Sequence, residues 1–126
     1  MPRVIHFEIH AEEPHRAIRF YSTVFGWKFK KWEGPRDYWL IQTVPKSSPG
    51  IDGGMIKREG PRGMGIQTYI CTIDVPNIDD YLGKVMIANG LVINPKMPVT
   101  GVGWIAHCKD PEGNIFGIMQ EDPAAK

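Results

Sequence analysis

The feature that most constrains this chain is a strand-to-helix unit that occurs twice, with the second copy beginning just past the middle of the sequence. Pro14 and Pro76, which are 62 positions apart, each follow an alternating strand by the same short step. Proline favours the first turn of a helix, and a similar order of elements follows both prolines. Internal duplication is the economical explanation, so we expect two similar modules.

The first copy reads as a strand, a helix and three further strands. Residues 4–11 alternate between apolar and polar, with Phe7 and Ile9 on the apolar face. An apolar stripe at helical spacing then runs from Pro14 until Gly26 supplies a stop. Three β-like runs complete the copy at residues 27–32, 38–43 and 51–58.

The second copy repeats this order after a link at residues 59–65. Residues 66–73 read as a strand, Pro76 opens a helix, and Asn89-Gly90 ends it. The last two strands should form a hairpin, because Asp110-Pro111-Glu112-Gly113 has the residue types of a type I turn. The three closing strand candidates are residues 91–94, 103–109 and 114–121. We therefore predict one domain over residues 1–126, made of half-modules 1–58 and 66–126.

Neither half-module can cover both faces of its own sheet. We therefore predict an α+β fold in which two βαβββ modules form one curved mixed sheet around a cleft, with the helices on the convex side. Alternation along the opening strand turns His6, Glu8 and His10 into that cleft. Thr68 and Ile70 are their expected counterparts in the second copy.

Composition and charge narrow the possible partners. The chain is 42% hydrophobic and 23% charged, which is ordinary for a globular domain. A net charge of +1, with no long basic run, argues against a nucleic-acid partner. No segment has the pattern of a secretory signal or the apolar length of a membrane span, so we expect a cytoplasmic protein without membrane contact.

Motifs in both halves resemble the vicinal oxygen chelate superfamily of glyoxalases, bleomycin resistance proteins and dioxygenases. The succession of HFEI, AIRFYSTVFGW and the hairpin DPEGN carries this resemblance, which covers nearly the whole chain. Known members include glyoxalase I, extradiol dioxygenases, methylmalonyl-CoA epimerase, and proteins that sequester bleomycin without catalysis. The resemblance therefore implies the fold, a small-molecule ligand and a homodimer, and it leaves the reaction open.

The resemblance also implies four positions at which metal enzymes of the superfamily hold a divalent ion with His, Glu or Gln. His6 stands at the first position, while Thr68 and Gly117 stand at two others. The fourth position falls within residues 52–55, where only Asp52 could bind a metal. Because a transition-metal site normally needs three or more N, O or S ligands, we expect no metal cofactor.

His6 and Glu8 are the candidate catalytic residues. Together they could act as a general base and its orienting carboxylate, working on an acidic C–H bond. A polar pair that only solvates an open sheet face is an equally good interpretation. A third interpretation is an unorthodox metal site that includes His10, since neighbours on one face of a strand lie about 7 Å apart.

The candidate ligand-binding residues come from several strands. Aromatic side chains line many ligand pockets, and Trp39 and Trp104 are expected near the mouth of the cleft. Met55 and Met119 lie at or beside the missing metal-ligand positions and would make the cleft floor apolar. The register of the strand that carries His107 is not fixed by the sequence, so its orientation stays open. The full set is Trp39, Thr68, Trp104, His107, Met55 and Met119.

Two functions follow from these residues. As an enzyme, the protein would be a lyase or isomerase that works without the usual divalent metal and uses His6 as base. As a binding module, it would sequester a small organic molecule of antibiotic type, with its tryptophans and without a catalytic base.

Overall fold

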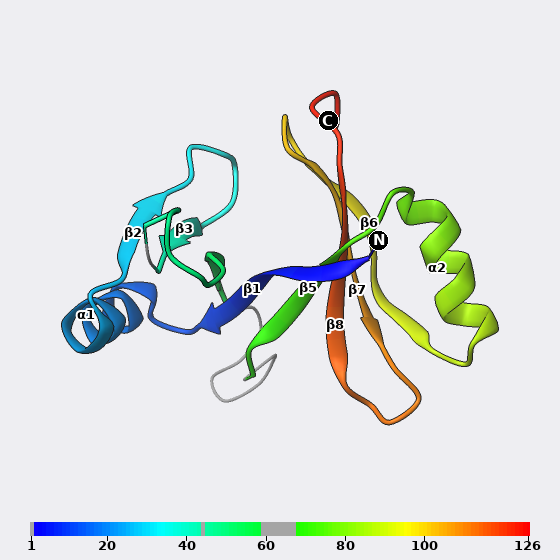
Figure 1. The fold of residues 1–126 in the computed structure, drawn as a ribbon, viewed down its shortest axis with the longest axis horizontal. Coiled ribbons are helices and arrows are strands. Elements are labelled where there is room, and N and C mark those ends of the chain that lie inside the picture. Colours follow the sequence, from blue (N-terminus) through cyan, green and yellow to red (C-terminus); the bar gives the residue numbers. More distant parts are fainter. Residues whose placement is uncertain (1, 44, 59–67) are drawn as a thin grey trace. The chain divides into compact units, whose positions relative to one another are not determined.

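The computed structural model describes residues 2–43, 45–58 and 68–126, which include eight strands and two helices (Figure 1). The predicted link at residues 59–65 lies outside these ranges. In chain order the elements are β1 (Arg3–Ala11), α1 (Pro14–Phe25), β2 (Lys28–Lys31), β3 (Tyr38–Gln42), β4 (Gly53–Lys57), β5 (Ile70–Asp74), α2 (Ile78–Ile87), β6 (Leu91–Val99), β7 (Gly103–Lys109) and β8 (Ile115–Glu121).

Hydrogen bonds join the strands in the order β2-β3-β4-β1-β5-β8-β7-β6. β1 pairs in parallel with β4, and β5 pairs in parallel with β8. The pairs β2·β3, β3·β4, β6·β7 and β7·β8 are antiparallel. The predicted α+β class, the mixed sheet and the repeated element order are therefore confirmed, while the cleft stays a prediction.

The chain divides into two compact units. The first unit is residues 6–69, and the second unit is residues 70–126 together with residues 1–5. The opening strand therefore contributes to both, and each unit otherwise contains one copy of the strand, helix and three-strand order.

Both helices have ends that the sequence explains. α1 begins at Pro14, and Gly26 ends it with a φ of 73° while its N–H donates to the Ser22 carbonyl. α2 begins later than predicted, because Asn77 caps it by accepting a hydrogen bond from the Asp80 N–H at 3.0 Å. Pro76 therefore precedes the cap rather than opening the helix.

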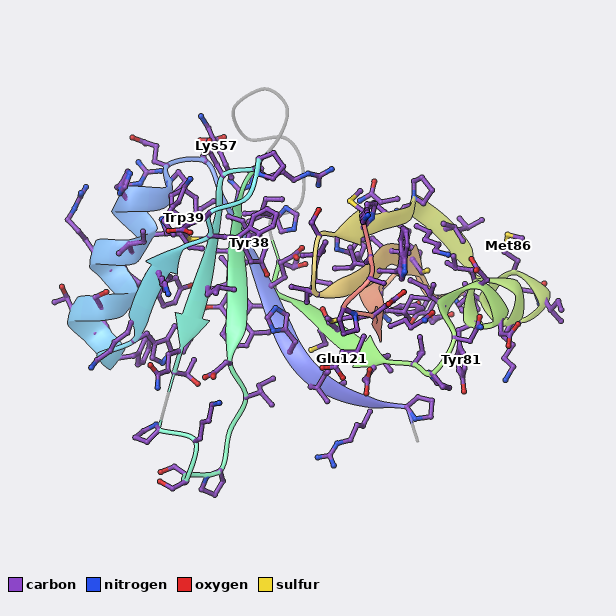
Figure 2. All side chains as sticks on the ribbon, turned by 90° about the horizontal axis from the view of Figure 1, so that it is seen from above. Tyr38, Trp39, Lys57, Tyr81, Met86 and Glu121 are labelled. Atoms are coloured by element: carbon purple, nitrogen blue, oxygen red, sulfur yellow. The ribbon has the colours of Figure 1, made fainter. Side chains whose placement is uncertain are left out.

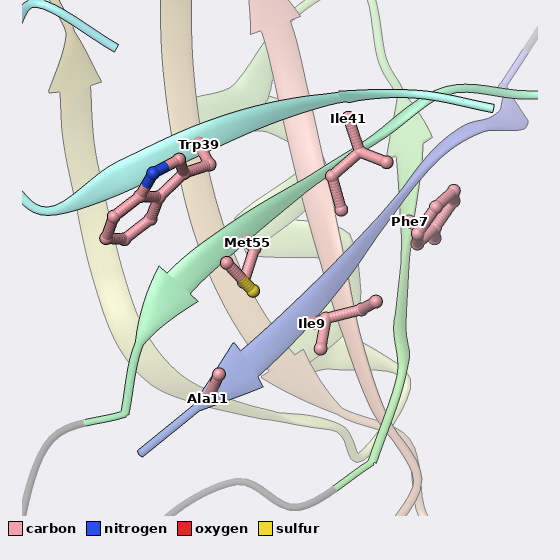
Figure 3. Packing of buried hydrophobic residues seen from close by; sticks show 6 residues of the cluster. All are labelled: Phe7, Ile9, Ala11, Trp39, Ile41 and Met55. Carbon is pink, nitrogen blue, oxygen red and sulfur yellow. The ribbon is translucent and has the colours of Figure 1, made fainter. Parts of the chain in front are cut away.

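The core of the first unit lies between its strands and α1. The buried side chains come from alternate positions of β1, β3 and β4, and Figure 3 shows them together. They are Phe7, Ile9, Ala11, Trp39, Ile41 and Met55. Burial of this face fixes the register of β1, because a slip by one residue would turn the polar face into the core.

The second unit has its own core, in which Val75, Ile78, Ala106 and Ile118 are buried. The predicted turn is confirmed, since the Gly113 N–H donates to the Asp110 carbonyl at 3.0 Å between antiparallel β7 and β8. β6 is longer than predicted and includes two prolines. It ends the strand order and carries register irregularities, which is where a sheet tolerates proline.

No helix in the described part of the chain combines the length and apolar character that crossing a membrane requires.

Candidate functional site

The polar face of β1 carries His6, Glu8 and His10, as predicted. Their neighbours Phe7 and Ile9 point the other way, into the core of the first unit. Across the parallel pair, Glu8 lies opposite Gly54 of β4. Three ionisable side chains therefore share one face of a strand whose other face is apolar.

Glu8 is only 4% exposed and forms a hydrogen bond with His10, whose Nε2 lies 2.8 Å from the Glu8 Oε1. Arg58 supports this pair, because its Nη2 donates to the His10 carbonyl at 2.8 Å. A buried carboxylate needs such a partner to offset the loss of hydration. In this contact Glu8 holds the imidazole of His10, and its role in orienting His6 stays a prediction.

His6 instead meets Tyr38, whose Oη lies 3.4 Å from the His6 Nε2. Burial lowers the pKa of His6, and the charges of Glu8 and Asp52 oppose that shift only in part. Burial raises the pKa of the Tyr38 phenol, and the Glu8 charge raises it further. At neutral pH the pair therefore consists of an uncharged imidazole and a protonated phenol.

Gly54 makes room for this pair. A Cβ atom built on Gly54 would overlap the hydroxyl and ring of Tyr38. The phenol thus lies over a position in β4 that falls among the metal-ligand positions of the resembled superfamily. Sequence reasoning did not single out Tyr38, although its alternation with the apolar Trp39 could have placed the two side chains on opposite faces.

Trp39 and Met55 do not share the face of His6, which corrects the predicted placement of both. Trp39 is buried and Met55 is 0% exposed, and both belong to the core beside α1. In Figure 2 Trp39 projects from β3 toward the helix, while Tyr38 projects to the other side. Both side chains lie in the apolar layer against which residues of α1 pack.

Trp104 is likewise not placed as predicted. Its ring packs against the core of the second unit, on the face that also carries Ala106. Its Nε1 donates to the Asp122 carboxylate at 3.0 Å, and the Lys96 ammonium lies 4.5 Å from its ring centroid. This tryptophan therefore contributes to packing within the second unit, where the sequence suggested a ligand contact.

Thr68 precedes β5 and is exposed, so it is not the residue of the second unit that corresponds to the polar face of β1. In β5 it is Thr72 that lies opposite Gly117 of β8 in a parallel pair. The predicted strand began too early, and residues 66–67 lie outside the described residues. By this pairing Thr72 is the counterpart of Glu8 in the second unit, while Thr68 lies outside β5.

His107 lies on the same face as Gly117, its partner across the antiparallel pair. The Asn94 side chain contacts its Nδ1 at 3.0 Å, which fixes the ring. Thr72 is 1% exposed, and its Oγ1 has no hydrogen-bond partner among the described residues. By alternation Met119 shares the face of Gly117, and its side chain is partly buried. The predicted pair His107 and Met119 thus lies on one face of the second unit.

The residues in β4 and the loop before it do not supply the metal ligand that the superfamily resemblance implies there. The Asp52 Oδ1 accepts from the Thr43 N–H at 2.9 Å, so this carboxylate holds the loop before β4. Gly54 has no side chain, and Met55 lies in the core. Within the described ranges, no cluster of three or more His, Cys, Asp or Glu residues is arranged to hold a metal ion.

Comparison with known proteins gives a family match. The model of the family described as "Glyoxalase/Bleomycin resistance protein/Dioxygenase superfamily" matches residues 3–118. The comparison with curated proteins gave no match.

Solved structures of similar fold include hypothetical protein BH1468 from Bacillus halodurans C-125, at 16% identity over 99% of this chain and 98% of that chain, with a TM-score of 0.68. Methylmalonyl-CoA epimerase from Mycobacterium tuberculosis is 18% identical over 95% of this chain and 88% of that chain, with a TM-score of 0.66. The Mn(II)-bound glyoxalase from Novosphingobium aromaticivorans is 15% identical over 98% of this chain but 38% of that chain, with a TM-score of 0.63. Likeness at these identities shows the fold alone.

Proposed function

Since this chain belongs to the glyoxalase/bleomycin resistance protein/dioxygenase superfamily, we propose that it binds a small organic molecule at His6 and moves a proton on it. The observation that carries the proposal is the partly buried His6 imidazole, held beside the Tyr38 hydroxyl on the polar face of β1. The reaction class would be that of a lyase or isomerase.

The chemistry follows from the charge state of His6. A neutral imidazole can accept a proton at pH 7, and burial keeps His6 neutral there by lowering its pKa. A suitable ligand has a C–H bond next to a carbonyl group, because the carbonyl stabilises the negative charge left on carbon. Methylmalonyl-CoA epimerase has a similar fold, and epimerisation beside a thioester is a reaction of this class.

We further propose that the reaction needs no resident metal. In the first unit His6 could bind a metal, but Gly54 has no side chain and the Met55 side chain lies in the core. The same proposal includes a homodimer, which the superfamily resemblance supports, and a cytoplasmic location, which the sequence pattern supports. Size-exclusion chromatography with light scattering tests the dimer. Calorimetric titration with zinc, nickel, manganese and iron tests the metal, and tight stoichiometric binding lost on His6→Ala would contradict the metal-free proposal.

The experiment that tests proton transfer is hydrogen exchange in D2O. A panel of 2-substituted thioesters, α-hydroxyketones and 2-oxo acids is incubated with the protein, and 1H NMR follows the loss of the signal next to the carbonyl. We expect exchange of at least one compound, and a decrease of about 10²-fold or more on His6→Ala. His15→Ala, at an exposed histidine in the first turn of α1, is the control.

The second candidate function is sequestration without turnover. The buried pair of Glu8 and His10 favours sequestration, because two polar side chains that satisfy each other can line a binding surface without taking part in a reaction. Saturable thermal stabilisation by a compound that undergoes no exchange supports this alternative. Exchange at the wild-type rate in His6→Ala would contradict His6 as base.

A further inference from the structure

We propose that Tyr38 is the positioning residue of His6, with its hydroxyl donating to Nε2 and holding that nitrogen in the unprotonated form. The hydrogen bond itself is independent of the proposed function. Its consequence for a ligand, that Nε2 is the atom that accepts the proton, rests on that function. Tyr38 would then decide which of the two imidazole nitrogens is the basic one.

The first support is the way in which the phenol is fixed. Tyr38 lies at the start of β3, opposite Ile56 of β4. Its carbonyl accepts from the Trp32 N–H at 2.8 Å, and the Trp32 ring stands edge-on to the phenol at 6.1 Å between centroids. A phenol held at both backbone and ring is a rigid donor, which is what orienting an imidazole requires.

The second support is the space at Gly54. The Tyr38 hydroxyl occupies the volume that any side chain at Gly54 would need. We infer that Gly54 is the residue that lets the phenol reach His6.

The third support is the direction of the hydrogen bond. The buried Tyr38 keeps its proton, because burial and the Glu8 charge both raise its pKa. In a pair of neutral groups, a phenol O–H is a stronger donor than an imidazole N–H, and an imidazole nitrogen is a better acceptor than a phenol oxygen. The O–H to N arrangement is therefore favoured, and the remaining proton of His6 lies on Nδ1.

The step on a ligand is balanced without any further reactant. The C–H bond next to the carbonyl breaks, its proton goes to Nε2, and the electron pair moves onto the carbonyl oxygen to give an enolate. Tyr38 releases Nε2 by rotation of its hydroxyl about the Cζ–Oη bond. In D2O the proton on Nε2 is replaced by a deuteron from the solvent, and transfer of that deuteron to the same carbon completes the exchange.

The test is the 15N spectrum of His6 at a pH where the imidazole is neutral. We expect the wild type to show an unprotonated Nε2, and Tyr38→Phe to lose that preference, because phenylalanine keeps the ring and removes the donor. Tyr21→Phe is the matched control, since the Tyr21 hydroxyl bonds to Tyr69 in the same unit. A protonated Nε2 in the wild type, or an unchanged spectrum in Tyr38→Phe, overturns the proposal.

Two further measurements separate this proposal from the proposed function. Gly54→Ala should displace the phenol and reproduce the His6 spectrum of Tyr38→Phe, with circular dichroism confirming the fold. An unchanged His6 spectrum in a folded Gly54→Ala protein would contradict the role of Tyr38. Where a compound exchanges in D2O, Tyr38→Phe should slow exchange by about 3- to 10-fold, because the loss of about one net hydrogen bond lowers the fraction of His6 whose Nε2 is unprotonated. The expected tautomer without exchange of any compound supports the positioning role and contradicts the proton-transfer function.

Discussion

The two units have the same arrangement of strands, but they carry different side chains at matching positions. In each unit a parallel strand pair sets a buried polar residue opposite a glycine, Glu8 opposite Gly54 and Thr72 opposite Gly117. In the first unit the glycine makes room for the Tyr38 phenol, and the face carries the hydrogen-bonded pair Glu8 and His10. In the second unit the space at Gly117 is bordered by Thr72 and His107, and Thr72 is uncharged. The two units therefore share the strand arrangement but not the polar side chains beside the glycine.

The difference lies in the strands that flank each pair. Tyr38 comes from β3 in the first unit, and His107 comes from β7 in the second. Neither residue is on the strands that repeat most clearly in the sequence. A functional face in this fold is therefore set by neighbouring strands as much as by the parallel pair itself.

The largest expected effect separates the two tryptophans. Trp39→Ala should lower the free energy of unfolding by about 3–5 kcal/mol, because it empties a buried site beside α1. Trp104→Ala should cost less, since Trp104 is only partly buried and its loss removes one hydrogen bond to Asp122. Urea denaturation measures both. Weakened ligand binding at unchanged stability in Trp39→Ala would contradict the core assignment and restore the ligand role.

The next effect compares the two glycines. Gly54→Ala should destabilise the protein by about 1–3 kcal/mol, because the new methyl group overlaps the Tyr38 phenol. Gly117→Ala should stay within about 1 kcal/mol of the wild type. Its Cβ would lie 3.1 Å from the Thr72 Oγ1, a contact that a small shift relieves, and alanine also restricts the unfolded chain. Thermal unfolding of both variants under the same conditions measures the difference, and equal losses would contradict it.

The sequence predicted the repeat and both polar faces in outline, and it failed where strand boundaries decide the outcome. The alternation in residues 4–11 is long enough to place His6 and Glu8 on the face of β1 opposite Phe7 and Ile9. In the second copy the pattern predicts a strand over residues 66–73, whereas β5 is Ile70–Asp74, so Thr68 lies outside the strand. Side-chain partners, such as Glu8 with His10 within β1 and His6 with Tyr38 across strands, depend on rotamers and register that a pattern does not contain.

A smaller effect concerns the Thr72 hydroxyl. Thr72→Val should leave stability unchanged or raise it by about 1 kcal/mol, because it replaces a buried hydroxyl that has no partner among the described residues. Thr72→Ser keeps the hydroxyl and loses the methyl group, so it should be the less stable variant. A loss of more than about 1 kcal/mol in Thr72→Val would indicate a bound partner such as water.

The smallest effect is the pH dependence that His6 gives to the first unit. Its folded-state pKa lies below the ordinary value of about 6.5, so the unfolded chain binds the proton first as the pH falls. Stability is therefore unaffected by His6 well above about pH 6.5 and is lost as the pH falls below it. His6→Asn should remove the part of the stability loss at low pH that His6 causes. The Tm of the variant minus the Tm of the wild type should therefore increase as the pH falls from about 8 to about 5. A difference in Tm that is constant with pH would mean that the folded and unfolded states bind the His6 proton equally. Burial would then not lower the pKa of His6, and the argument that His6 is neutral at pH 7 because it is buried would fail.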